Sequence, residues 1–190
     1  MAEQDNVQAS TAPADRGWLG LIDDFVRNLG ELPRGALAKL ARGSRATSGQ
    51  AFGAFYKALP YQLAKHEDAL LIAAMAYSIC KGGKHFAGSF GKTARVVKMN
   101  GGYGSLDRRF TTLLDSNIDN GELEYRLIQM VRMAKSKDIG IDWKQLAIDL
   151  IDWNRDEESM PRASGGGSPV QKRWALDYFG TRPVDPDEKE

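Results

Sequence analysis

The chain has 190 residues, of which 42% are apolar and 27% are charged, a balance that allows a packed core and excludes wholesale disorder. Its length fits one domain or two small ones. No apolar run approaches the ~20 residues that a membrane-spanning helix needs, and the polar, acidic residues 1–15 match neither a signal nor a transit peptide. A single cysteine excludes an internal disulfide framework, so we expect a cytoplasmic protein without a membrane partner.

The formal net charge of +1 conceals a strong segregation of charge along the chain. Residues 34–109 contain thirteen basic and three acidic residues, a net charge of +10, whereas residues 1–33 carry −4 and residues 110–190 carry −5. Since like charges repel one another, such segregation favours a polyanionic partner. The phosphate backbone of a nucleic acid is the commonest polyanion.

Apolar residues recur at helical spacing along almost the whole chain. Pro33 marks a helix start, and residues 67–80 are apolar on nearly every side, which is typical of a helix at the centre of a bundle. Glycine-rich residues 81–89 and 100–104 predict loops. The expected helices cover residues 16–29, 32 onward, 48–59, 67–80, 90–99, 106–114, 119 or 120 onward, 142 onward, and 168–179.

Capping residues predict where the later helices begin and end. Ser105, either Asp119 or Asn120, and Asp142 each stand before an apolar helical pattern, and Gly180 ends the last one. No stretch of six residues alternates convincingly between apolar and polar. The sequence therefore predicts an all-α protein of about eight or nine helices in two small packed helical bundles.

The predicted organisation has four parts. A disordered arm (1–15) precedes a basic helical bundle (16–100), a second helical bundle follows (105–180), and a disordered acidic tail (181–190) ends the chain. Within the second bundle, residues 155–167 are polar and rich in glycine and serine, which predicts a linker.

The segment Gly88-Ser-Phe-Gly-Lys-Thr93 partly matches a phosphate-binding loop. That motif needs a glycine at the position of Phe86 and a preceding strand, whereas this segment follows a predicted helix. The plainer interpretation is a helix N-terminus with a nearby lysine, which by itself attracts anions.

Metal and carboxylate chemistry have weak support. With two histidines, His66 and His85, and one cysteine, the chain lacks the three or four ligands of a structural zinc site, so we expect no metal and no cofactor. Asp149 and Asp152 are three residues apart on one predicted helix. They are candidates for acid–base chemistry, but a solvated face or an ion pair between packed helices fits them better.

The basic residues fall on helical faces beside apolar ones. On the helix that follows Pro33, Arg34, Lys39, Arg42 and Arg45 share one arc, and Leu37 and Leu40 lie on the other side. Sparse aromatic residues favour contact with the backbone rather than base stacking. The candidate DNA-binding residues are Arg34, Lys39, Arg42, Lys81, Lys84, Lys92, Arg95, Lys98, Arg108 and Arg109.

Five ordered segments resemble a known family. They are Leu32-Pro-Arg-Gly-Ala-Leu-Ala-Lys-Leu40, Phe55-Tyr-Lys-Ala-Leu-Pro60, Ser89-Phe-Gly-Lys-Thr-Ala94, Arg108-Arg-Phe-Thr-Thr-Leu-Leu114 and Ile141-Asp-Trp-Lys-Gln-Leu-Ala-Ile-Asp-Leu-Ile-Asp-Trp153. Over residues 19–179 the chain resembles CasB, the small subunit of the type I-E CRISPR surveillance complex Cascade. One departure is Ala41-Arg42-Gly43, where the family pattern has paired bases.

The resemblance implies an all-helical subunit that is not an enzyme. Its basic surface would bind and stabilise target DNA, chiefly the displaced strand, in the R-loop during antiviral defence. By matched motif, Arg34, Lys92, Arg108 and Arg109 would face the DNA. The implied partners are the other Cascade subunits, a second copy of the chain, and the guide RNA–DNA R-loop, especially its single-stranded displaced DNA.

Two alternatives stay open. One is a scaffold or adaptor that binds acidic proteins, and the other is a nucleotide-using enzyme built on Gly91-Lys-Thr93. Four aromatic residues are candidates either for docking on neighbouring subunits or for ordinary core packing: Trp18, Trp174, Tyr178 and Phe179.

Overall fold

The computed structural model describes residues 17–43, 49–101, 104–153 and 170–180. The predicted arm, linker and acidic tail lie outside these residues. The described helices are α1 Trp18–Glu31, α2 Arg34–Arg42, α3 Gly49–Ala58, η1 Tyr61–His66, α4 Glu67–Cys80, α5 Phe90–Met99, α6 Leu106–Leu114, α7 Glu122–Ser136, α8 Trp143–Ile151 and α9 Val170–Phe179. Nine are α-helices, η1 is a 3-10 helix, and no strand occurs in the described part, which confirms the predicted all-α fold.

The predicted capping residues act in different ways. Asp142 caps α8, since its Oδ1 accepts a hydrogen bond from the Gln145 backbone N–H at 2.9 Å. Ser105 stands at the N-cap of α6, but its side chain makes no capping hydrogen bond. At α7 the N-cap is Gly121, and Asn120 accepts from the first helical N–H, that of Glu122, at 2.9 Å.

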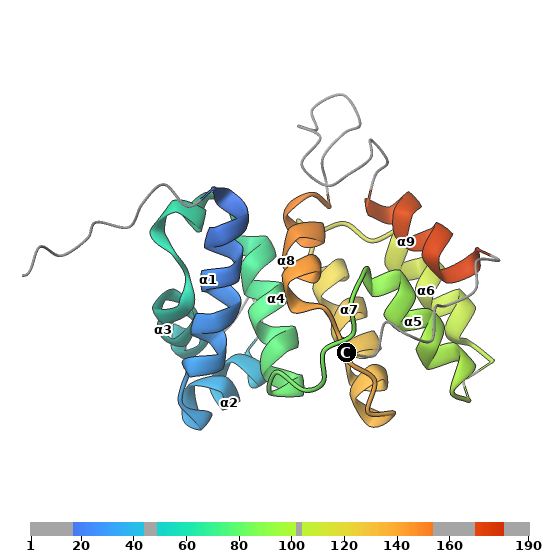
Figure 1. Cartoon of the computed structure of the whole chain (residues 1–190), viewed down its shortest axis with the longest axis horizontal. Helices are drawn as coiled ribbons and strands as arrows, with labels where there is room; N and C mark the ends of the chain where they lie inside the picture. The colour runs from blue at the N-terminus through green and yellow to red at the C-terminus, as the bar shows by residue number, and fades with distance from the viewer. Residues whose placement is uncertain (1–16, 44–48, 102–103, 154–169, 181–190) are drawn as a thin grey trace, which may run out of the picture.

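Helix α4 lies at the centre of the molecule, as its apolar sequence predicts. Every residue from Ala69 to Ala76 is buried, and α4 packs against α2, α7 and α8. Along the longest axis, α1, α2 and α3 lie at one end and α5, α6 and α9 at the other, with α4, α7 and α8 between them (Figure 1). A long stretch of α4 is thus enclosed by neighbours on all sides.

Helix α5 packs mainly against α9 and also touches α7, although the predicted division near residue 100 lies between α5 and both of these helices. The division of the chain into two bundles stays a prediction. None of the helices in the described ranges is long and apolar enough to span a bilayer.

Helix α9 packs an aromatic face into the core. Trp174 and Tyr178 are 0% and 3% exposed, and their rings contact those of Phe90 and Phe110 at centroid distances of 5.3 and 4.1 Å. A docking role for Trp174 and Tyr178 is therefore wrong, because these rings are part of the core. Phe179 is half exposed and Trp18 is half-buried, so a docking role for either stays untested.

Candidate nucleic-acid interface

The basic residues of α2 lie on its solvent face. Leu40 is fully buried and Leu37 is half-buried, while Arg34, Lys39 and Arg42 are exposed, as the helical arc predicts. Since α2 packs against α3 and α4, these three basic side chains lie on the side of α2 away from those helices. The fourth member of the predicted arc, residue 45, lies outside the described residues.

The basic loop after α4 is held against the corner between α7 and α8. The Lys84 carbonyl accepts from the Ile141 backbone N–H at 3.1 Å, and the Trp143 Nε1–H donates to the Gly82 carbonyl at 2.6 Å. The loop approaches so closely that a Cβ at Gly140 would lie 2.6 Å from the Lys84 carbonyl oxygen. Lys81 ends α4 in a left-handed conformation and is exposed, whereas the Lys84 ammonium forms an ion pair with Asp138.

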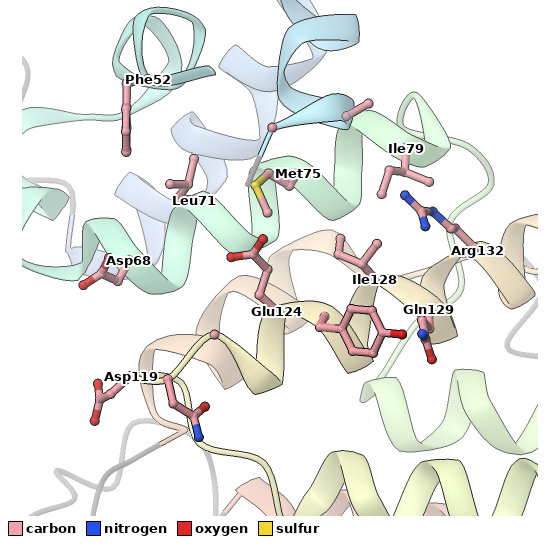
Figure 2. Close-up of a pocket in the computed structure, with 15 residues that line it drawn as sticks. Phe52, Asp68, Leu71, Met75, Ile79, Asp119, Glu124, Ile128, Gln129 and Arg132 are labelled. Carbon is pink, nitrogen blue, oxygen red and sulfur yellow. The ribbon is translucent and has the colours of Figure 1, made fainter. Parts of the chain in front are cut away.

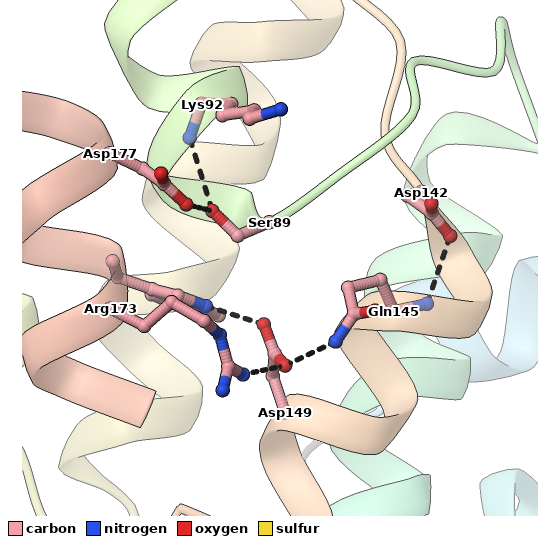
Figure 3. A network of polar contacts seen from close by, with 8 residues as sticks. Ser89, Lys92, Asp142, Gln145, Asp149, Arg173 and Asp177 are labelled. Carbon is pink, nitrogen blue, oxygen red and sulfur yellow. Dashed lines mark hydrogen bonds and ion pairs between the residues drawn. The ribbon is translucent and has the colours of Figure 1, made fainter. Parts of the chain in front are cut away.

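The N-terminus of α5 is capped by the chain itself, as Figure 3 shows. Ser89 Oγ accepts from the Lys92 backbone N–H at 3.4 Å and donates to Asp177 Oδ2 at 2.5 Å, while the Gly88 N–H donates to Asp142 Oδ2 at 3.2 Å. Two carboxylates thus stand where a phosphate-binding loop would hold its anion. Since no strand precedes α5 in the described part of the chain, the geometry is that of a helix cap.

Helices α5 and α6 carry the second group of basic residues. Lys92 and Arg95 are half-buried on α5, and Arg108 and Arg109 are exposed in the first turn of α6. Lys98 differs from them, because its Nζ lies 2.8 Å from Asp107 Oδ1 and 5.3 Å from the centroid of the Tyr178 ring.

Asp107 ties α9 to both of these helices. The Tyr178 hydroxyl of α9 donates to Asp107 Oδ1 at 2.7 Å, and the same carboxylate accepts from Lys98 of α5. The hydrogen bond from Lys98, followed by that from Tyr178, holds the pKa of the Asp107 carboxyl below its usual range. The positive charge of Lys98 is therefore balanced in the free chain.

The ten predicted residues do not converge on one compact patch. Helix α2 lies at one end of the longest axis and helices α5 and α6 at the other, with the loop after α4 between them (Figure 1). Any surface that joins all ten must run along the molecule, which fits an extended ligand better than a compact one.

Asp149 forms a buried polar network rather than an acid–base site. It is 0% exposed, its Oδ1 accepts from Gln145 Nε2 at 2.7 Å and pairs with Arg173, and its Oδ2 accepts from Trp174 Nε1 at 2.5 Å (Figure 3). Burial raises the pKa of the Asp149 carboxyl, and the Arg173 charge opposes that rise. The solvated-face interpretation is wrong for both aspartates, since Asp152 is buried as well, and the ion pair between helices is confirmed for Asp149.

A groove of about 640 Å³ lies between α4 and α7 (Figure 2). Met75 and Ile128 contribute to its apolar lining, Glu124 is one of its acidic residues, and Arg132 lies beside Ile79 at the end of α4. The ten predicted basic residues all lie outside this lining. No cluster of three histidine, cysteine or acidic side chains within the described ranges has the arrangement of a metal site.

Comparison with known proteins identifies the family. The family of CRISPR-associated protein Cse2 matches residues 36–179, three quarters of the chain. The chain belongs to the Cse2 family. A CRISPR-associated protein Cse2 from Thermus thermophilus is 30% identical over 146 residues, which cover 72% of this chain and 76% of that relative. The predicted resemblance to CasB is thereby confirmed.

Two crystal structures share the Cse2 fold. CasB from M. ruber has a TM-score of 0.59 and 24% identity, over 83% of this chain and 92% of that one. A Cse2-family protein from Thermus thermophilus has a TM-score of 0.60 and 22% identity, over 85% and 96%. The Cse2 match starts two residues after Arg34 and ends with α9, so Arg34 and α1 lie outside it.

The Cse2 fold also brings two lysines of the α7 end, which the sequence reasoning missed, beside the predicted ones. Lys135 Nζ donates to the Ile79 carbonyl at 2.6 Å, and Lys137 Nζ donates to the Asn100 carbonyl at 2.6 Å. They lie in a stretch of net negative charge, so charge segregation gave no signal for them. The sequence shows both lysines near the end of a predicted helix. It does not show that α7 packs on α4, which brings Lys135 to the end of that helix.

Proposed function

We propose that this Cse2 protein is the non-catalytic small subunit of a type I-E Cascade complex. Its basic surface binds and stabilises target DNA in the R-loop, chiefly the displaced strand, during antiviral defence in the cytoplasm. The observation that carries the proposal is the exposure of basic residues on α2 and α6 in a chain of the Cse2 family.

The energetics of R-loop formation make such contacts effective. Exchanging a DNA duplex for a guide RNA–DNA duplex is nearly balanced in free energy, so contacts to the backbone shift the equilibrium. The displaced strand is a linear polyanion. The helices of this chain that carry the basic residues, α2 at one end and α5 and α6 at the other, are spread along the longest axis of the molecule. Each contact is weak alone, but assembly with other Cascade subunits and a second copy of the chain raises the local concentration of DNA.

A salt titration of single-stranded DNA binding tests the proposal. Replacing Lys92, Arg95, Arg108 and Arg109 with alanine should reduce the slope of log K against log salt by about 0.7 for every phosphate that the variant no longer binds. The helical circular-dichroism signal should not change. The control replaces four exposed basic residues on other helices: Arg27, Lys57, Lys65 and Lys172.

The two variants separate the alternatives. A shallower slope in the first and not in the control supports DNA binding by α5 and α6. If the quadruple variant and the control variant have the same slope, DNA binding by α5 and α6 is contradicted, and the scaffold that binds acidic proteins is favoured. Purification from the native host should also recover a guide RNA and the other Cascade subunits with the chain.

A further inference from the structure

The C-terminal end of α4 gathers basic residues from two helices. Lys81 is the C-cap residue of α4 and is exposed, and Lys135 of α7 reaches the same end, where its Nζ donates to the Ile79 carbonyl at 2.6 Å. Arg132, one turn earlier on α7, is exposed and points toward Ile79 (Figure 2). Three basic residues from two elements therefore lie at or near one helix end.

The partner of Lys135 is a neutral carbonyl. A carbonyl holds an ammonium in place without cancelling its charge, and leaves other N–H donors of the ammonium available. The negative end of the α4 dipole also favours cations there. By contrast, Lys84 and Lys98 form ion pairs with Asp138 and Asp107.

A hollow of about 230 Å³ opens beside this helix end. Its lining includes Lys84, Lys135, Asp138 and the backbone of Gly82 and Gly83. The side chains of Lys84 and Asp138 are 67% and 76% exposed, so water and salt screen their ion pair, which a phosphate group can replace. Two lysines, Lys84 and Lys135, thus line one opening.

We propose that Lys81, Arg132 and Lys135, with Lys84 across the hollow, bind backbone phosphates of a nucleic acid. Helices α4 and α7 lie between α2 and the pair α5 and α6 along the longest axis (Figure 1), so the proposed site would link the basic residues at the two ends of the molecule. The inference rests on the proposed function, and it adds two residues of α7 that neither the charge pattern nor the matched motifs indicated.

The test is the salt dependence of single-stranded DNA binding by the full chain. The double variant Arg132→Gln and Lys135→Gln should lower the slope of log K against log salt by about 1.4, since each phosphate contact contributes about 0.7. Asp138→Asn should tighten binding at low salt, because it removes the negative charge that lines the hollow. The matched control is Arg126→Gln with Lys172→Gln, one base on α7 and one on α9.

The double variant separates phosphate binding from a purely structural role of Lys135, because a role limited to holding the Ile79 carbonyl predicts altered thermal stability without a change of slope. Lys135→Arg keeps the charge and should therefore keep the wild-type slope. A wild-type slope in the double variant, or unchanged affinity in Asp138→Asn, overturns the assignment. Failure of the proposed function gives another result: the variant in which Lys92, Arg95, Arg108 and Arg109 are replaced with alanine would then bind DNA with the wild-type slope.

Discussion

Replacing Gly91 with alanine tests whether this glycine serves helix packing or a bound phosphate. A Cβ at Gly91 would lie 2.4 Å from the Trp174 carbonyl oxygen and 2.8 Å from the Trp174 Cα, both backbone atoms of α9. The α9 backbone cannot yield easily, because the Trp174 ring is fully buried against Phe90 and Trp153 at centroid distances of 5.3 and 5.0 Å.

Two opposing contributions set the magnitude. Alanine is more favourable than glycine within a helix by about 1 kcal/mol. Overpacking a dense core costs about 1–3 kcal/mol, and more where backbone must move. We place the Gly91 clash at the upper end and expect a net loss of about 1–2 kcal/mol, which lowers the melting temperature by about 2–8 °C in a chain of this size.

Gly53 provides the matched control. It is also helical, but a Cβ there meets nothing within 4 Å. Gly53→Ala should therefore raise the free energy of unfolding by up to about 1 kcal/mol. Thermal and urea unfolding followed by circular dichroism measure both variants. Equal or greater stability of Gly91→Ala would refute the packing account, whereas opposite signs for the two alanines would support it.

Two further predictions concern Asp149, which is buried, and Cys80, which is half-buried. Asp149→Ala leaves the Arg173 guanidinium and the buried Trp174 N–H without their acceptor, so it should cost about 3–5 kcal/mol in urea unfolding. Lys144→Ala, which breaks an exposed pair with Asp23, should cost less than about 1 kcal/mol; similar losses would contradict the role of burial. Burial raises the pKa of the Cys80 thiol to about 11, so at neutral pH the thiol stays protonated. Iodoacetamide, which reacts with the thiolate, should therefore modify the folded chain far more slowly than the urea-unfolded chain, and equal rates would show that Cys80 is accessible and ionised.

Helix positions were predictable wherever a local signal specified them. The bounds of α4, α5 and α6 match the prediction, because glycine-rich loops separate these helices and Ser89 caps α5. The 3-10 helix Tyr61–His66 was missed, since six residues after a proline are too few for a periodic pattern to emerge.

The partners of charged residues were not predictable from spacing along one helix. The helical arc correctly placed Arg34, Lys39 and Arg42 on the exposed side of α2. The partners of Lys84 and Asp149 lie 54 and 24 residues away along the chain, on segments whose packing no local pattern determines.

The fold also redistributes the charge that is segregated in the sequence. Carboxylates from the acidic last third reach the basic middle third at Lys84, Gly88 and Ser89, through Asp138, Asp142 and Asp177 respectively. The +10 of residues 34–109 therefore overstates the field around the loop after α4 and the start of α5. The positive charge of the exposed basic residues on α2 and in the first turn of α6 is less offset, because these three carboxylates bind elsewhere. A polyanion should consequently be held most firmly toward the two ends of the molecule, with the cations from α7 supplying the charge that the middle would otherwise lack.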